Sequence, residues 1–138
     1  MSWSIAQRAI VADASVAVPL LLGHPDWLRA WRSWTEADAL VLVPPHFGHE
    51  VANALLRSAR VGAAATMSAL EDLARLRYDI ADRGFSGLQA SVRLAGEHGL
   101  SVYDAAYLEL AIDVDGELAT LDTDLRAAAV KESVPLIG

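Results

Sequence analysis

Five acidic side chains, spread along the whole chain, are the residues best placed to do chemistry. They are Asp13, Glu50, Asp104, Asp122 and Asp124. Two carboxylates about 4 Å apart repel by about 4 kcal/mol at an effective dielectric constant near 20, so a cluster of them needs protons, Arg partners or a cation. Carboxylate oxygens without Cys or His favour Mg²⁺ or Mn²⁺. Such an ion can activate water to attack a phosphodiester and can offset charge on the leaving oxygen.

Each acid also has an ordinary structural explanation. Asp13 could simply cap a helix, Asp104 could belong to a capping box, and Asp122 or Asp124 could begin the last helix. Glu50 could be a solvated helix residue. Taken one at a time these explanations are favoured, because cap and surface acids are common. The hypothesis of a metal site therefore depends on the acids meeting at one place.

Short apolar runs followed by turns predict the strands that would bring them together. Ile10–Ala12 is such a run and ends at Asp13, and a later run ends at Asp122. The expected strands are 10–12, 40–43, 118–122 and 134–137. Helical patterns alternate with them, which predicts an α/β fold, a three-layer sandwich with a mainly parallel central sheet flanked by helices. Ligands bind such sheets beyond the carboxyl ends of the strands. Pro135 favours the sheet edge for the last strand.

Helices are expected between these strands, with residues 78–84 as a turn region. Their expected ranges are 16–22, 26–37, 46–61, 63–77, 86–97, 105–112 and 123–131. Ser86 with Gln89, and Ser101 with Asp104, match capping boxes. Pro19 is expected near the first turn of its helix. Trp27, Trp31 and Trp34 share one helix face, which indicates a core position or, alternatively, a partner-binding surface.

Some polar residues near the acids are secondary candidates. Asn53, one turn after Glu50, could hold a ligand or phosphate, and Thr120, two residues before Asp122, could do the same. His46 and His49 are expected to be surface or capping residues, because their spacing does not match the zinc-protease pattern.

Composition limits the class of protein. The chain has 138 residues, which suggests one domain over 1–138, and its formal charge of −7 argues against broad, charge-driven nucleic-acid binding. The absence of Cys excludes disulfides and fits a cytoplasmic protein. The first residues lack a signal-peptide layout, and no apolar run approaches the ~20 residues that cross a bilayer, so no membrane association is expected.

Four stretches follow one another in an order and spacing that cover nearly the whole chain: Val11–Ser15, Glu50–Leu55, Gly99–Ala111 and Leu118–Leu125. Together they resemble the PIN-domain proteins of the VapC type, ribonuclease toxins of type II toxin–antitoxin pairs. The segments Tyr-Asp-Ala-Ala-Tyr-Leu and Ala-Thr-Leu-Asp are the specific ones.

The resemblance implies a Mg²⁺- or Mn²⁺-dependent endoribonuclease that hydrolyses RNA. Asp13, Glu50, Asp104 and Asp122 match the family's acidic metal-binding positions, and Asp124 matches an acid that only some members use. It also implies a homodimer inhibited by a small antitoxin that inserts an Arg into the acidic pocket. For RNA contacts the nearest basic residues in sequence to Glu50 are Arg57 and Arg60, whose alternative is a solvated helix surface.

Two other functions fit parts of the same pattern. The fold could serve as a catalytically silent partner-binding module, although intact acids argue against it. A receiver-type signalling domain also gathers acids at strand ends, but it needs a Lys after a late strand, and here the only Lys is Lys131 in the expected last helix.

Overall fold

A five-stranded sheet forms the centre of the molecule. The structure, a computed structural model, describes residues 7–138. The strands are β1 (Ala9–Ala12), β2 (Leu40–Val43), β3 (Asp79–Ile80), β4 (Glu117–Ala119) and β5 (Leu136–Ile137). Their order is β3-β2-β1-β4-β5, and every neighbouring pair is parallel. The predicted α/β fold with a parallel sheet is therefore confirmed, as is the edge position of the last strand.

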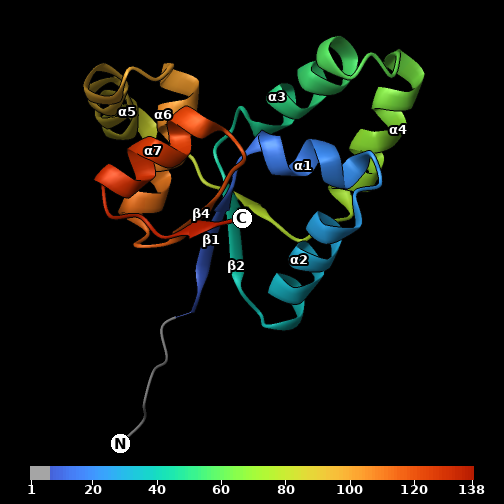
Figure 1. Cartoon of the computed structure of the whole chain (residues 1–138), viewed down its shortest axis with the longest axis horizontal. Helices are drawn as coiled ribbons and strands as arrows, with labels where there is room; N and C mark the ends of the chain where they lie inside the picture. Colours follow the sequence, from blue (N-terminus) through green and yellow to red (C-terminus); the bar gives the residue numbers. More distant parts are fainter. Residues whose placement is uncertain (1–6) are drawn as a thin grey trace, which may run out of the picture.

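Helices cover both faces of this sheet and make the three-layer sandwich (Figure 1). On one side lie α5 (Gly84–His98), α6 (Val102–Asp113) and α7 (Thr123–Lys131). On the other side lie α1 (Ala14–Leu21) and α2 (Pro25–Glu36), with α3 (Phe47–Asn53), the π-helical turn η1 (Ala54–Ser58) and α4 (Ala63–Ala74) beyond them. Each crossover between parallel strands passes through at least one helix, as parallel pairing requires.

The core forms where the central strands meet these helices. Ile10, Val11 and Ala12 of β1 are fully buried because β1 is flanked by strands on both sides and helices on both faces. Trp31 and Trp34 are also buried, with their ring centroids 5.4 Å apart. The core interpretation of the α2 aromatic face is therefore confirmed for these two residues. Each fully buried large side chain contributes roughly 1.5–3 kcal/mol of transfer free energy.

The predicted turn at 78–84 is partly wrong, because it contains β3. Asp79 and Ile80 pair with the carboxyl end of β2, and both side chains are exposed. A two-residue edge strand with exposed side chains has no hydrophobic alternation, so the sequence pattern did not indicate it. The same region corrects the start of α5. The helix begins at Gly84, where Asp82 accepts a hydrogen bond from the Gly84 amide, so the predicted capping box at Ser86 lies inside the helix.

Two more helices differ from the prediction. Pro19 lies in the interior of α1 rather than its first turn, because the helix begins at Ala14. The single helix expected over 46–61 is instead α3 followed by η1, and a π-helical segment cannot be distinguished from an α-helix by apolar spacing. The capping box at Ser101 is confirmed, since its hydroxyl accepts a 3.0 Å hydrogen bond from the Asp104 amide.

Within residues 7–138, none of the helices is long and apolar enough to cross a bilayer. The prediction about a signal peptide rests mainly on residues 1–6, which lie outside the described part of the chain.

Candidate active site

The four principal acids line one cavity of about 520 Å³. Asp13 follows β1, Glu50 comes from α3, Asp104 from the first turn of α6, and Asp122 begins α7. Residues from α1 and η1 complete the wall, among them Ser15, Pro19 and Ser58. Residues far apart in sequence therefore contribute carboxylates to the same space, at the carboxyl ends of the strands where such folds bind ligands.

Strand register explains how the first wall of the cavity is built. Ala12 of β1 pairs with Ala119 of β4, so the next residues, Asp13 and Thr120, leave the sheet side by side. The Thr120 hydroxyl donates a 2.7 Å hydrogen bond to Oδ2 of Asp13. The amide of Asp122 in turn donates to Thr120 Oγ1 at 3.0 Å. The backbone amide of Asp122 thus orients the Thr120 hydroxyl, and this hydroxyl in turn orients the Asp13 carboxylate.

Ser15 supports Asp13 in the same way. Its hydroxyl donates a 2.7 Å hydrogen bond to Oδ2 of Asp13 and accepts one from the Leu121 amide at 2.8 Å. Asp13 occupies the N-cap position of α1, but its side chain makes no capping hydrogen bond. The purely capping explanation therefore does not account for this carboxylate.

Burial raises the pKa of the Asp13 carboxyl above its ordinary value. The hydrogen bonds from Thr120 and Ser15 offset part of this effect, and the charge of Glu50 adds to it. The pKa of Asp104 is raised as well, first by burial and then by the charges of Asp13, Asp122 and Glu50. Both ionised carboxylates are therefore under-compensated by the surrounding protein.

Two hydrogen-bond donors contact the carboxylate of Glu50. The fully buried Tyr107 of α6 donates from its hydroxyl to Oε1 at 2.6 Å, and Nε2 of His46 lies 3.2 Å from the same oxygen. Burial raises the pKa of Glu50, but the hydrogen bonds from His46 and Tyr107 outweigh it, and the net pKa lies below the ordinary value. The protein therefore favours the ionised form of Glu50, in contrast to Asp13 and Asp104.

His46 and Tyr107 were not predicted from the sequence to be part of the site. The prediction of His46 as a surface or capping residue is wrong for its side chain, which is partly buried and contacts Glu50. His46 does occupy the N-cap position of α3, but its side chain makes no capping bond. Its Nε2 lies 3.0 Å from the Tyr103 carbonyl oxygen, which can only accept, so Nε2 carries a proton. His46 is four residues before Glu50, and Tyr107 is three after Asp104. These helical spacings were the available signal.

Asp104 and Asp122 each take part in capping a helix and also line the cavity. The backbone of Asp104 is capped by Ser101, whereas its side chain lines the cavity. Oδ1 of Asp122 accepts a 2.8 Å hydrogen bond from the Leu125 amide, so Asp122 does cap α7 while also lining the cavity. The capping explanation and the site explanation hold together for this residue.

The remaining candidates lie outside the cavity lining. Asp124 is exposed in the first turn of α7, and Asn53, Arg57 and Arg60 are exposed on or just after α3 and η1. His49 is exposed, as expected.

The donor chemistry of the cavity fits a hard divalent cation. Its acids offer only oxygen, and raised pKa values at Asp13 and Asp104 show negative charge that a cation would compensate. Within residues 7–138, however, no three cavity acids bring ligand oxygens within 4.8 Å of one another. Mg²⁺ keeps several waters and usually binds only one or two carboxylates directly, so it does not require three carboxylates in contact.

Comparison with known proteins supports the same architecture. The PIN domain family model matches residues 10–131. Ribonuclease VapC3 of Pyrobaculum aerophilum is 33% identical over 120 residues, covering 84% of this chain and 91% of that protein. The crystal structure of Mycobacterium tuberculosis VapC20, described as a Sarcin-Ricin loop cleaving toxin, matches with a TM-score of 0.71 at 20% identity over 86% of this chain and 94% of that one.

VapBC2 from Rickettsia felis, solved with a DNA fragment from its promoter, also matches, with a TM-score of 0.71 at 15% identity over 94% of this chain and 97% of that one. The chain belongs to the PIN domain family. Its relatives there include VapC proteins, so the resemblance drawn from the sequence is confirmed.

Proposed function

We propose that this protein is a divalent-metal-dependent endoribonuclease that acts as the toxin of a toxin–antitoxin pair in the cytoplasm. The observation that carries the proposal is the meeting of Asp13, Glu50, Asp104 and Asp122 around one cavity. The 33% identity to a protein named Ribonuclease VapC3 supports RNA as the substrate class.

Asp13, Glu50, Asp104 and Asp122 would hold Mg²⁺ or Mn²⁺ directly or through water. When bound, the ion would activate water and offset charge on the leaving oxygen of the phosphodiester. Ser15 and Thr120 fix the Asp13 carboxylate, and His46 and Tyr107 fix Glu50. Asp124 is a fifth candidate ligand. Because it is exposed and outside the cavity lining, we expect its substitution to reduce RNA cleavage less than substitution of the four cavity acids.

Arg57 and Arg60 are proposed to contact RNA phosphates. Both are exposed, and in the described residues neither forms an ion pair with an acid. Arg57 lies in η1 and Arg60 just after it, and Ser58 and Ala59 between them line the cavity. Guanidinium groups on residues next in sequence to the cavity lining are suited to bidentate phosphate contacts.

We further propose a small antitoxin and a homodimer as partners. Proteins of similar structure include VapBC2 and a toxin–antitoxin complex from Klebsiella pneumoniae. An acidic cavity whose carboxylates lack compensating charge is complementary to an inserted Arg. Exposed apolar side chains such as Leu56 and Met67, on η1 and α4, would give the helices an apolar contact surface.

The direct test is RNA cleavage by purified protein with Mg²⁺ or Mn²⁺. Asp13→Asn, Glu50→Gln and Asp104→Asn are expected to remove cleavage while keeping the folded circular dichroism spectrum. Glu71→Gln and Asp72→Asn, at exposed acids of α4, are the matched controls and should cleave normally. Unchanged cleavage in the three cavity variants would end the site assignment. A folded wild-type protein with no cleavage of any RNA would favour the partner-binding module.

A further inference from the structure

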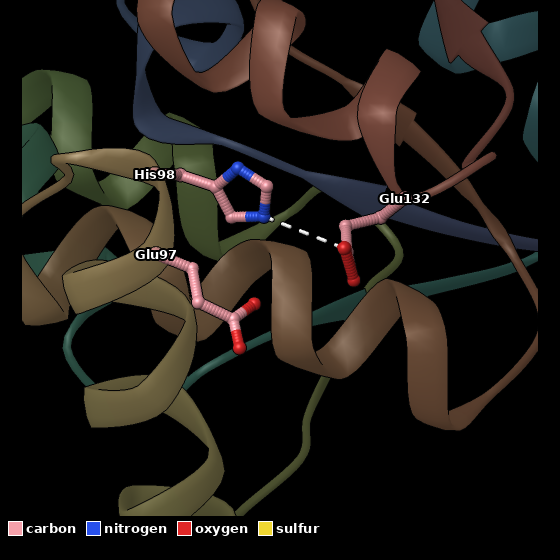
Figure 2. A group of neighbouring side chains, drawn as sticks. All are labelled: Glu97, His98 and Glu132. Atoms are coloured by element: carbon pink, nitrogen blue, oxygen red, sulfur yellow. Dashed lines mark ion pairs between the residues drawn. The ribbon is translucent and has the colours of Figure 1, made fainter.

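A second group of ligand-type side chains lies outside the acidic cavity. Glu97 and His98 end α5, and Glu132 directly follows α7. Figure 2 shows the three side chains turned toward one another from these two helix ends. One ligand atom of each lies within 4.8 Å of the other two. Among residues 7–138, this is the one group of three His or acidic side chains that lies so close together. None of the three lines the acidic cavity.

The His98 ring is the observation that separates this triplet from an ordinary acidic surface. Its side chain is only 8% exposed, yet Nε2 is buried with no hydrogen-bond partner among the described residues. Buried polar atoms are almost always paired, so an orphaned ring nitrogen needs an explanation. Nε2 points at Glu132, whose Oε2 lies 3.4 Å away (Figure 2). This is ion-pair distance for a protonated ring, but it is longer than the usual N–H···O hydrogen bond.

Charge at the two helix ends also favours a cation there. The carboxyl end of a helix carries partial negative charge, which disfavours carboxylates and favours cations. Glu97 and Glu132 nevertheless occupy the ends of α5 and α7. The available counter-charge for Glu97 is Arg93, whose Nη1 lies 3.5 Å from Oε1 in an exposed pair. Such a weak surface pair is easily displaced.

We propose that Glu97, His98 and Glu132 form a second metal site that takes a borderline divalent ion such as Zn²⁺. Zn²⁺ accepts both imidazole nitrogen and carboxylate oxygen as ligands, whereas carboxylate and water oxygens suit Mg²⁺ and Mn²⁺. A bound ion would pair the orphaned Nε2 and neutralise both carboxylates. It would also join the ends of α5 and α7, so its role is to stabilise the fold rather than to cut RNA.

The test uses untagged Asp13→Asn/Glu50→Gln protein, in which two of the four cavity acids are replaced by neutral amides. Micromolar ZnCl₂ is expected to raise its melting temperature and to bind with a stoichiometry of about one ion per chain by calorimetry. MgCl₂ at the same concentration is expected to do neither. In the wild-type imidazole ¹⁵N spectrum, Zn²⁺ should shift Nε2 of His98.

Adding His98→Gln to this background is expected to abolish the Zn²⁺ response, and Glu132→Gln to weaken it. The matched control is His24→Gln, which changes an exposed His before α2 and should keep the full response. If His98→Gln does not fold, Glu132→Gln, at a partly exposed side chain, decides the question. An equal Zn²⁺ response in the Glu132→Gln and His24→Gln proteins would overturn the proposal, as would the absence of any response in the background protein.

Discussion

The hydroxyl of Tyr107 donates a 2.6 Å hydrogen bond to Oε1 of Glu50, which links α6 to α3 at the edge of the acidic cavity. Tyr107→Phe keeps the ring volume and removes only this donor. Because hydrogen bonds to charged groups contribute about 1.5–3 kcal/mol, we expect the free energy of unfolding to fall by about 2 kcal/mol. Urea denaturation in EDTA measures the change. Tyr103→Phe, at a side chain that is 65% exposed, is the control and should be neutral.

Asp13→Asn is expected to stabilise the metal-free protein in a pH-dependent way. Burial raises the pKa of this carboxyl above 3.8, so the folded protein holds its proton to higher pH than the unfolded chain does. That contribution to stability is fully present below the ordinary pKa and is lost as pH rises through the raised pKa. The amide side chain of the variant cannot ionise. The free energy of unfolding of the variant relative to wild type should therefore rise as pH increases above 3.8.

Urea unfolding of both proteins in EDTA at a series of pH values measures this difference. Comparing the two proteins removes contributions common to both, such as that of the lowered pKa of Glu50. The difference also contains the effect of the Asp13 charge on the pKa of Asp104. A stability difference that stays constant across the series contradicts the idea that the Asp13 charge is under-compensated.

Arg83 neutralises a buried carboxylate that does not line the acidic cavity. Its Nη2 lies 3.1 Å from Oε1 of Glu109, whose side chain is 7% exposed, and 2.8 Å from Asp113. Arg83→Met should destabilise the protein by about 3 kcal/mol, because it leaves a buried charge unpaired. Arg75→Met, which breaks an exposed pair with Asp72, should change stability by less than about 1 kcal/mol. Equal losses of stability in the two variants would mean that the buried charge of Glu109 does not require Arg83 for compensation.

Expression of the chain alone is expected to arrest bacterial growth, because RNA cleavage without an inhibitor stops protein synthesis. Glu50→Gln should abolish the arrest, and a small protein encoded beside the chain should relieve it. Colony counts after induction measure both effects. Normal growth at high expression, with the protein soluble, would favour the partner-binding module.

Much of the architecture could be predicted because it rests on local patterns. The run Ile10–Ala12 followed by Asp13 predicted a buried strand and its carboxyl end. The run 118–122 predicted a second strand, although β4 ends at Ala119, so its last three residues are not strand. Short exposed elements carried no such pattern, which is why β3 was missed.

Contacts between elements could not be predicted in the same way. Tyr107 meets Glu50 across 57 positions of sequence, and His98 meets Glu132 across two helix ends, so no motif spacing joins either pair. Their identification required the three-dimensional structure, in which one hydrogen bond joins α6 to α3 and one ion pair joins the ends of α5 and α7.

The central claim is that Asp13, Glu50, Asp104 and Asp122 gather to bind a divalent ion. Thermal melting during a Mg²⁺ titration tests it most directly, since binding to the folded state stabilises by RT ln(1 + [L]/Kd). The wild-type melting temperature should rise steadily with Mg²⁺, and that of Asp104→Asn should rise much less. A wild-type melting temperature indifferent to Mg²⁺, or an equal rise in both proteins, would contradict the account.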